Sequence, residues 1–422
     1  MLEGKGVPAV VLGTDAFISL ARAAALKYGL PHLAVATVAH PIGGVDPKLV
    51  ADKAETIVDE VLAALTHDPA PPRSMTAAAG AVGVTAPDDL DDFQVWAMER
   101  QWSDGLPVLP PTPERVTRLL GGRDHTQMIA TLAPLDGCAT LEAIAINAAL
   151  AGAGPEHLPV IVAAVRALAD PAFNLNAIQT TTHPCTPLVI VNGPIAGRLG
   201  IGGGANALGN GHRANAVIGR AVRLVLQNVG GARPGHEDRA TLGHAGKFSY
   251  CLAENEAASP WAPLSVERGF PAGASTVTVV GAEAPHNVND HGSTTAEALL
   301  RALAGTAATT GSNNIYLGGH PVVILGPEHA ATIAGSGWSK AEFKRRLWER
   351  ARVRLDRFSA ENLARFSIIA PERFVGRPPG ADVPWCVSPD DLVVIVAGGP
   401  GKHSSVIPTF GATRSVTVAI EE

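Results

Sequence analysis

The chain has 422 residues, 46% of them hydrophobic and 17% charged, with a formal net charge of −6 at neutral pH. This length exceeds one small core and predicts two or three domains of a globular protein. The negative balance argues against nucleic acid as the main partner, because phosphate binding requires a basic surface. No apolar run approaches the roughly 20 residues of a membrane span, which argues against a membrane partner.

The N-terminal sequence has no charged-then-apolar leader, and four cysteines in so long a chain do not make a disulfide framework. We therefore expect a reduced, cytoplasmic protein. The sequence contains no signature for NAD, ATP or pyridoxal phosphate (PLP), so it identifies no cofactor.

The first predicted unit, residues 1–65, is a small parallel α/β unit. The segments VPAVVLG and LAVATVA indicate strands, and DAFISLARAAALKYG between them indicates a helix ending at Gly29. A long helix, PKLVADKAETIVDEVLAALT, follows. Two strands make a marginal core, so we expect the unit to bury an apolar face against the rest of the chain, another copy or a second subunit.

Residues 66–92 are rich in Pro, Ala, Gly and acids without periodicity, which predicts a linker. The main region, 93–422, is expected to be a larger α/β region of repeated strand–Gly–helix modules. LVIVNGPIA (188–196) resembles VVILGPEHA (322–330), with LVVIVAGGPGK (392–402) a looser copy. Shared α/β grammar is the alternative to true duplication. Helices are predicted at 140–153, 156–169, 212–227, 294–309 and 339–355.

Residues 6–65 resemble the second half of the UGSC family of thioredoxin-like or racemase-like (seleno)proteins. The resemblance rests on GVPAVVLGTDAF, LARAAALKYGLP and VAHPIGGVDP. The family's name comes from a selenocysteine- or cysteine-Gly-Ser-Cys motif that precedes this segment, and the sequence contains no C-G-S-C. We expect either that a partner chain supplies that half or that the segment has become structural. The main region, through DGLPVLPPT and GHRANAVIGRA, resembles an uncharacterised domain fused to UGSC modules.

A glycine-rich loop that leads into a predicted helix, within 200–231, is the main candidate for ligand binding. Glycine is placed where the backbone must turn or approach another group closely, and the amides of such a loop attract anions. A packing loop between a strand and a buried helix is the alternative. The predicted substrate-binding residues here are Gly202, Gly203, Gly204, Asn206 and Arg213.

The segment EAPHNVNDHGSTTAEAL (283–299) is the main catalytic candidate, because polar residues at the end of a strand occupy the usual position of α/β sites. His286 and His291 are expected to move protons, with Asp290 orienting an imidazole, and Asn289 to bind substrate. The two histidines and Asp290 are alternatively metal ligands. A solvated loop rich in turn residues is the third interpretation.

Cys138 is the candidate thiol, because Thr140 is predicted to cap a helix and a helix N-terminus stabilises a thiolate. Simple packing is the alternative. Cys185 has His183 close by but is flanked by prolines, and Cys251 and Cys386 show no sign beyond packing. In GGPGKHSS (398–405), Lys402 and His403 are predicted to bind a carboxylate or phosphate, or else form an ordinary turn.

Together these features predict an enzyme that acts on a small polar, anionic metabolite, with lyase or other carbon–heteroatom bond chemistry. One alternative is a thiol-dependent reductase subunit that works with a UGSC-containing partner. Another is a non-catalytic partner subunit. A homo-oligomer or a second subunit is expected in each case, and metal dependence is left open.

Overall fold

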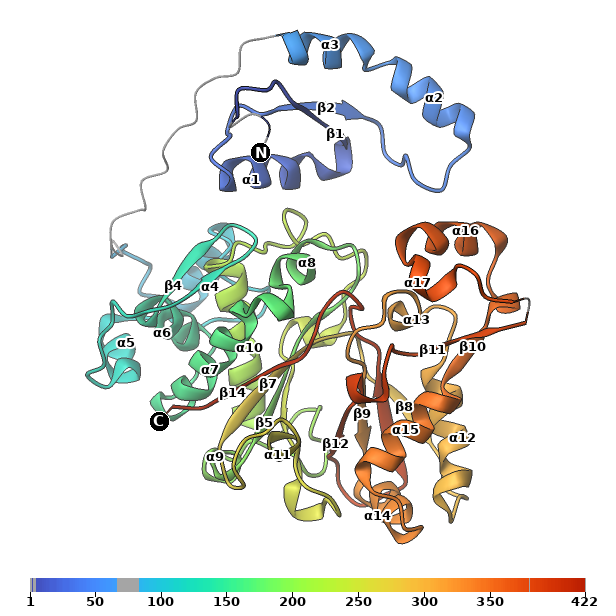
Figure 1. Ribbon diagram of the computed structural model, residues 1–422. Helices are drawn as coiled ribbons and strands as arrows, with labels where there is room; N and C mark the ends of the chain where they lie inside the picture. The colour runs from blue at the N-terminus through green and yellow to red at the C-terminus, as the bar shows by residue number, and fades with distance from the viewer. Residues whose placement is uncertain (1, 3–4, 67–82, 379, 422) are drawn as a thin grey trace.

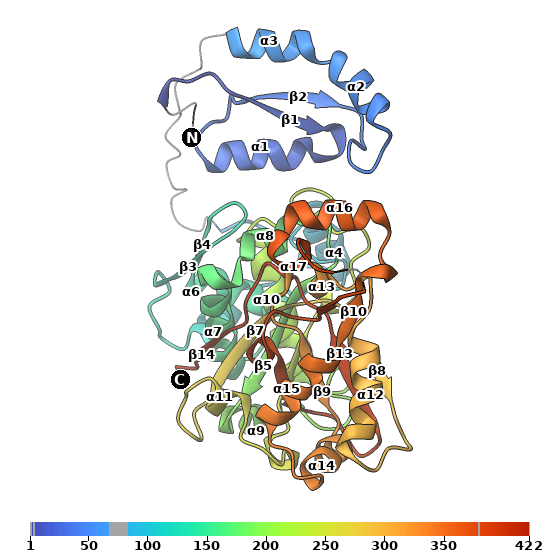
Figure 2. The same cartoon turned by 45° about the vertical axis from the view of Figure 1, so that its right-hand side comes forward.

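The computed structural model describes residues 2, 5–66, 83–378 and 380–421. They form a small N-terminal unit (5–66) and a larger body (83–421), which stand one above the other in Figures 1 and 2. The fold is α/β, as the sequence predicts, with a parallel sheet in the unit and mixed sheets in the body. No helix of the described chain is both long and apolar enough to cross a membrane.

The N-terminal unit is built on a two-stranded parallel sheet. β1 (Val10–Thr14) pairs along its whole length with β2 (Ala34–Val38), and α1 (Ile18–Lys27) connects them. The strands are rich in β-branched residues, whereas alanine and leucine dominate the helix, so local preference and topology agree. The predicted small parallel unit is confirmed.

The long helix predicted at the end of this unit is two helices. α2 (Pro47–Glu55) begins after Asp46, whose carboxylate accepts the Lys48 N–H at 2.7 Å. α3 (Val58–Thr66) begins after a break at Thr56, whose hydroxyl donates to the Lys53 carbonyl at 2.7 Å. A run of three β-branched residues at the break, with a hydroxyl that competes for backbone groups, explains the interruption.

Contacts between described residues of the unit and the body include an ion pair and a cation–π contact. Lys27 forms an ion pair of 3.1 Å with Asp136, and the Arg239 guanidinium lies 5.2 Å from the ring centre of Phe17. Large apolar side chains of the unit stay exposed in the single chain. They include Leu12, Leu26, Tyr28, Leu49, Val58 and Leu62.

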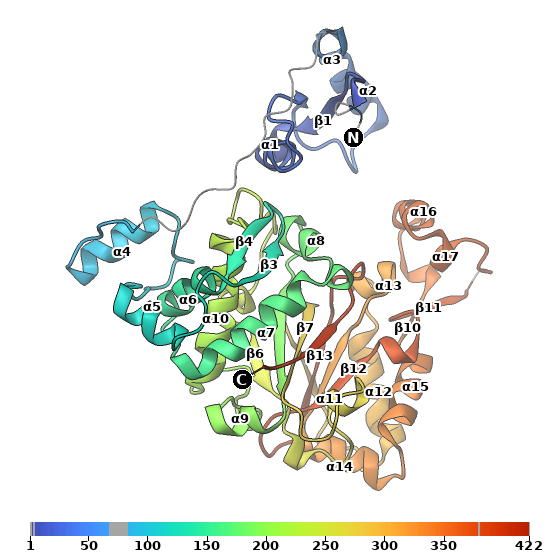
Figure 3. The same cartoon turned by 60° about the vertical axis from the view of Figure 1, so that its left-hand side comes forward.

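The body consists of two four-stranded mixed sheets packed face to face, with helices on both outer sides. The strand order is β14-β7-β5-β6 in the first sheet and β12-β9-β13-β8 in the second. Figure 3 shows α7 and α10 on one side of the strands and α12 and α15 on the other. The strands are β5 (Thr186–Asn192), β6 (Cys251–Ala253), β7 (Thr276–Ala282), β8 (His286–Asn289), β9 (Val322–Leu325), β12 (Val393–Val396), β13 (His403–Ile407) and β14 (Val416–Ala419).

Alternation along each central strand divides its side chains between two cores. In β5, Leu188 and Ile190 join the core between the sheets, while Val189 and Val191 face the outer helices. The same alternation holds in β9. The outer helices are α6 (Leu141–Leu150), α7 (Leu158–Ala169) and α10 (Arg213–Asn228) on the first sheet, and α12 (Ala296–Ala307), α14 (Pro327–Gly335) and α15 (Lys340–Arg350) on the second.

The remaining elements connect or flank these layers. α4 begins at Leu90, inside the predicted linker, most of which (67–82) lies outside the described residues. These elements are α4 (Leu90–Glu99), α5 (Pro113–Leu120), β3 (Met128–Leu132), β4 (Gly137–Thr140), α8 (Leu175–Thr180), α9 (Pro194–Leu199), α11 (Leu264–Glu267), α13 (Asn313–Leu317), β10 (Arg352–Arg354), α16 (Ala360–Ile369), α17 (Pro371–Phe374) and β11 (Asp382–Pro384).

The two main copies of the repeated phrase occupy equivalent places. Each forms a fully buried central strand, β5 or β9, followed by a glycine and a helix that begins with proline, α9 or α14. Each central strand has a parallel neighbour on one side, β6 or β12, and an antiparallel neighbour on the other, β7 or β13. The looser copy, β12, differs, because it is a parallel edge strand that leads into β13 and not into a helix.

The outermost strands are exchanged between the sheets. β8 follows β7 in the chain but pairs with β13 of the second sheet, and β14 follows β13 but pairs with β7 of the first. The two crossing segments meet at an antiparallel bridge between Ala282 and Thr409. When the body is divided after β8, so that each half holds one main copy of the repeated phrase, each half contributes one edge strand to the sheet of the other.

Candidate functional site

The glycine-rich loop, residues 200–212, lies against the segment that follows β12. The Gly398 N–H donates to the Gly203 carbonyl at 2.8 Å, and a Cβ on Gly399 would lie 2.7 Å from that of Ala205. The two glycine-rich segments therefore approach each other more closely than side chains would allow. They form one continuous wall.

The loop is held from inside by two side chains. Buried Asn215 accepts the Gly202 N–H at 2.7 Å and donates to the carbonyls of Gly202 and Ala207. His212 Nε2 donates to the Ala205 carbonyl at 3.0 Å, and its ring occupies the place that a Cβ on Gly202 would take. Part of the glycine content is thus structural, because the backbone makes room for the loop's own side chains.

The predicted binding residues of this loop separate into two groups. Asn206 lines a cavity beside the loop, and a Cβ on Gly204 would meet open space. The Gly202 N–H and carbonyl are hydrogen-bonded to Asn215, and the Gly203 carbonyl accepts the Gly398 N–H. Arg213 does not reach the cavity, because it donates to the Gly152 carbonyl at the end of α6, at 3.1 Å.

The opposite wall comes from the antiparallel pair β8 and β13. The Nε2 atoms of His291 and His403 lie 3.3 Å apart, with the rings edge to face. His403 Nδ1 lies 3.1 Å from Asn287 Oδ1. With this amide oxygen as acceptor, Nδ1 carries the proton, and Nε2 of a neutral His403 offers its lone pair to His291. We call His291 and His403 the histidine pair.

Lys402 lies beside the histidine pair. Its Nζ donates to the His291 carbonyl at 3.2 Å, and the side chain is half-buried. The ammonium group keeps two further protons, so it can also bind an anion. In the structure, the side chains of His291, Lys402 and His403 therefore lie in one cluster.

Asn289 is the cross-strand partner of His403, whereas Asp290 and His286 lie apart from the pair. The Asp290 carboxylate accepts hydrogen bonds from Ser293 and from the Gly292 N–H, and it contacts no imidazole. Desolvation acts to raise the pKa of Asp290, but these hydrogen bonds outweigh it and lower the pKa. By the alternation of β8, His286 lies on the face of Val288, opposite to Asn287 and Asn289.

Two buried residues that the sequence analysis missed support the strand that carries His403. Ser404 Oγ lies 2.7 Å from His329 Nδ1, and His329 Nε2 donates to the Asp290 carbonyl at 3.0 Å. Ser404 Oγ also accepts the Gly326 N–H at 3.1 Å. Comparison of the two repeats could have pointed to His329, because the first copy has Ala196 at the equivalent position.

The cavity between the two walls has a volume of about 400 Å³. Its lining combines small and apolar side chains with the polar edge of β13, so it suits a small molecule with few polar groups to be recognised. It is lined by Asn206, Ala207, Leu208, Gly209, Leu252, Ile324, Ala397, Gly398, His403, Ser404 and Ser405.

Cys138 lies elsewhere, on the β3–β4 hairpin. Thr140 caps α6 as predicted, its Oγ1 accepting the Ala143 N–H at 3.1 Å, but Cys138 belongs to strand β4 and is exposed. The other three cysteines are buried. Burial raises the pKa of both Cys185 and Cys251 to about 12, and that of Cys386 as well, so packing describes them.

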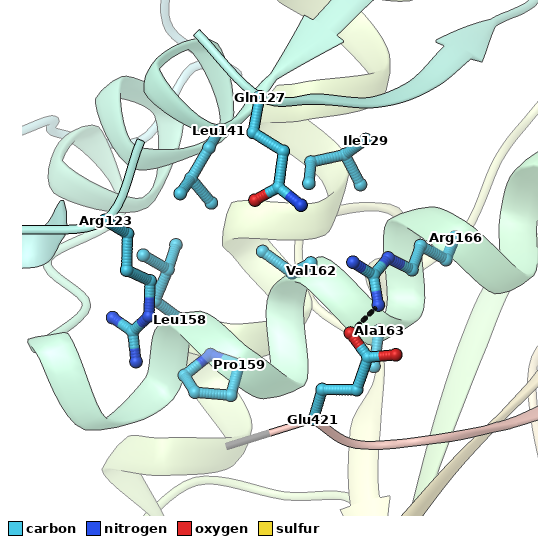
Figure 4. Close-up of a pocket in the computed structure, with 10 residues that line it drawn as sticks. All are labelled: Arg123, Gln127, Ile129, Leu141, Leu158, Pro159, Val162, Ala163, Arg166 and Glu421. Carbon is cyan, nitrogen blue, oxygen red and sulfur yellow. Dashed lines mark hydrogen bonds and ion pairs between the residues drawn. The ribbon is translucent and has the colours of Figure 1, made fainter. Parts of the chain in front are cut away.

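A further cavity, of about 190 Å³, lies between β3 and α7 and is drawn in Figure 4. Arg166 and Glu421 point toward each other on one side of it and form an ion pair. Its floor is aliphatic, and this pair neutralises one of its two arginines, so we assign it no chemistry.

No group of three or more His, Cys, Asp or Glu side chains in residues 5–66, 83–378 and 380–421 is arranged to hold a metal ion. The metal alternative is also weakened by the separation of His286 from His291. No curated protein and no solved structure shows a significant match to the chain. Residues 1–67 match the UGSC family, in agreement with the resemblance seen in the N-terminal sequence.

Proposed function

We propose that the chain is an enzyme that moves a proton on a small anionic metabolite, and that the reaction is an elimination or addition of the lyase type. The observation that carries the proposal is the histidine pair, placed at the edge of a cavity with a glycine-rich wall. Imidazoles exchange protons near neutral pH, and a partner that fixes the tautomer turns one of them into a directed base.

The neighbours of the pair provide the other parts of such a reaction. Asn287 holds the proton on Nδ1 of His403, so that Nε2 is the basic atom. In this arrangement His291 Nε2 carries the hydrogen between the two rings, so His291 is the acid of the pair and His403 is the base. Lys402 supplies a positive charge near the pair for a carboxylate or phosphate of the substrate, whose negative charge grows as a carbon is deprotonated.

The test follows proton abstraction directly. The full chain is incubated in D₂O with a panel of small hydroxy- and amino-carboxylates, and proton NMR records deuterium incorporation beside the carboxylate. We expect exchange with at least one compound, and a loss of about 100-fold or more in His403→Gln and His291→Gln. His125→Gln, an exposed histidine outside the cavity, serves as the control. Equal exchange rates in all four proteins contradict the proposal.

A second candidate function is a thiol-dependent subunit, and one observation favours it. Cys138 is exposed on the hairpin whose turn residue Asp136 pairs with Lys27 of the UGSC-like unit. A thiol at this junction is accessible to a group presented by that unit or by a partner chain. We expect Cys138 to react with iodoacetamide faster than Cys251 or Cys386. A Cys138 that reacts no faster than these two would contradict this second function and leave the histidine pair as the proton-transfer group.

A further inference from the structure

A cluster of buried charges lies outside the site described above, between α10 and the loop at residues 231–249. Asp238 accepts hydrogen bonds from Lys247 Nζ at 2.6 and 2.8 Å and from Arg223 Nη2 at 3.0 Å. The three side chains are 6%, 17% and 7% exposed, respectively. Burying three charges together is costly unless they are paired, and here two cations share one carboxylate.

The cluster forms one side of a cavity of about 400 Å³. Another wall is apolar, because Leu242 and Phe248 stand at the cavity with 91% and 43% of their surfaces exposed. Exposed apolar side chains that lie together beside polar groups mark surfaces that meet a ligand or partner, and these two line the same cavity. The lining residues are Asp104, Arg223, Gln227, Pro234, Gly235, Asp238, Ala240, Leu242, Gly243, His244, Lys247 and Phe248.

The charges of the cavity leave an excess of one positive charge. Arg223 and Lys247 outnumber Asp238, while Asp104 is balanced by Arg220 through hydrogen bonds of 2.8 and 2.9 Å. Burial is the largest influence on Lys247 and lowers its pKa, which Asp238 opposes. For Asp238, burial acts to raise the pKa, but the two cations outweigh it and lower the pKa. An added anion would balance the remaining positive charge.

Donors for such an anion are present. Lys247 uses two of its three protons on Asp238, and Arg223 uses Nη2 for Asp238 and the Ala232 carbonyl. We propose that this cavity binds a small organic carboxylate with an apolar tail, the head held by Lys247 and Arg223 and the tail against Leu242 and Phe248. The site is distinct from the histidine pair and does not depend on the function proposed for it.

The experiment uses 4-fluorobenzoate as the probe and the full chain as the receptor. Its fluorine NMR line broadens on binding, and a titration gives the Kd. We expect saturable binding by the wild type and a Kd at least about 10-fold higher in Lys247→Met, because a hydrogen bond to a charged group is lost. Asp238 stays paired with Arg223 in this variant.

Two controls separate this site from general effects. Lys344→Met removes a different buried lysine, on α15, outside the lining of this cavity. Its Nζ pairs with Glu267 Oε1 at 2.6 Å, as Lys247 pairs with Asp238. His403→Gln alters the histidine pair. We expect Kd values within two-fold of the wild type in both.

If Lys247→Met does not fold, Ala240→Leu provides the decision, because it fills the cavity without removing a charge. We expect this variant also to weaken binding by at least about 10-fold through steric exclusion. Absence of saturable binding by the wild type overturns the proposal. So does an unchanged Kd in whichever of the two variants folds.

Discussion

Directly after the shared Gly-Pro, two side chains of the second repeat differ in chemistry from those of the first. Glu328 and His329 stand where the first copy has Ile195 and Ala196. Glu328 Oε1 accepts the Gly401 N–H at 2.7 Å, and His329 meets Ser404. Both contacts support the 401–404 segment, so these two differences act next to the histidine pair.

Asn287 and Asn289 offer a matched comparison for the positioning of His403. Both are exposed on the same face of β8, but Asn287 alone hydrogen-bonds to His403. We expect Asn287→Ala to slow deuterium exchange by about 10-fold or more, since His403 loses the group that fixes its tautomer. Asn289→Ala should leave the rate unchanged. Equal effects of the two substitutions would contradict a positioning role.

His320 gives the body a pH-dependent stability. Burial lowers its pKa from 6.5 to about 4, and its Nδ1 accepts the Ser415 N–H at 3.1 Å. Between these values the unfolded chain binds more protons than the folded protein, so the free energy of unfolding falls as the pH drops from 6.5 towards 4. The loss amounts to about 3 kcal/mol at most.

This contribution is fully present above pH 6.5. Urea unfolding measured across this range should show a weaker pH dependence in His320→Asn, which keeps an acceptor near the position of Nδ1 but does not titrate. An equally steep dependence in the variant would assign the effect to other groups.

The candidate site was predictable only in part, for reasons visible in single residues. His291, Lys402 and His403 follow or begin strands, which the sequence shows, and the structure brings them together. The pairing of β8 with β13 joins segments about 110 residues apart in the chain, which no local pattern reveals. The sequence groups His286 with its polar neighbours, but the alternation of β8 turns its side chain to the face opposite Asn287.

At the scale of elements, glycine at the end of β5 makes a sharp test. Gly193 has a φ of +87°, and a Cβ there would lie 2.4 Å from the Ala274 carbonyl oxygen. Gly193→Ala should lower the free energy of unfolding by about 3 kcal/mol or more, because strain and a backbone clash add. Gly197→Ala, in α9 with open space around the Cβ position, should change it by less than about 1 kcal/mol. Denaturant titration of both variants measures the difference.

Element types were easier to predict than their connections. The five helices predicted in the main region correspond to α6, α7, α10, α12 and α15, because their apolar residues recur with helical spacing. Phe343 and Leu347 of α15 are both buried, in agreement with their i, i+4 spacing. The antiparallel direction of β7 was not predictable, since a strand buried on both faces has the same composition in either arrangement. β13 begins inside the segment that was predicted to bind an anion or form a turn.

For the whole molecule, the exposed apolar side chains of the N-terminal unit lead to a test of its independence. Leu12, Tyr28 and Leu62 are 61%, 58% and 55% exposed in the single chain. A protease site inserted between residues 67 and 82 allows the unit to be released. We expect the fragment to self-associate or unfold, because two strands bury too little apolar surface. A folded, monomeric fragment in sedimentation and circular dichroism would contradict this expectation.

The exchanged strands β8 and β14 have a consequence for how the body comes apart. Each half contributes an edge strand to the sheet of the other half, so neither sheet is complete when the halves are separated. Loss of β14 removes an edge strand of the first sheet, although β14 lies at the end of the second half in the chain. The body should therefore melt in a single calorimetric transition whose van't Hoff and calorimetric enthalpies agree. When the chain is split after β8 and the two parts are encoded separately, soluble protein should form only if both parts are expressed together.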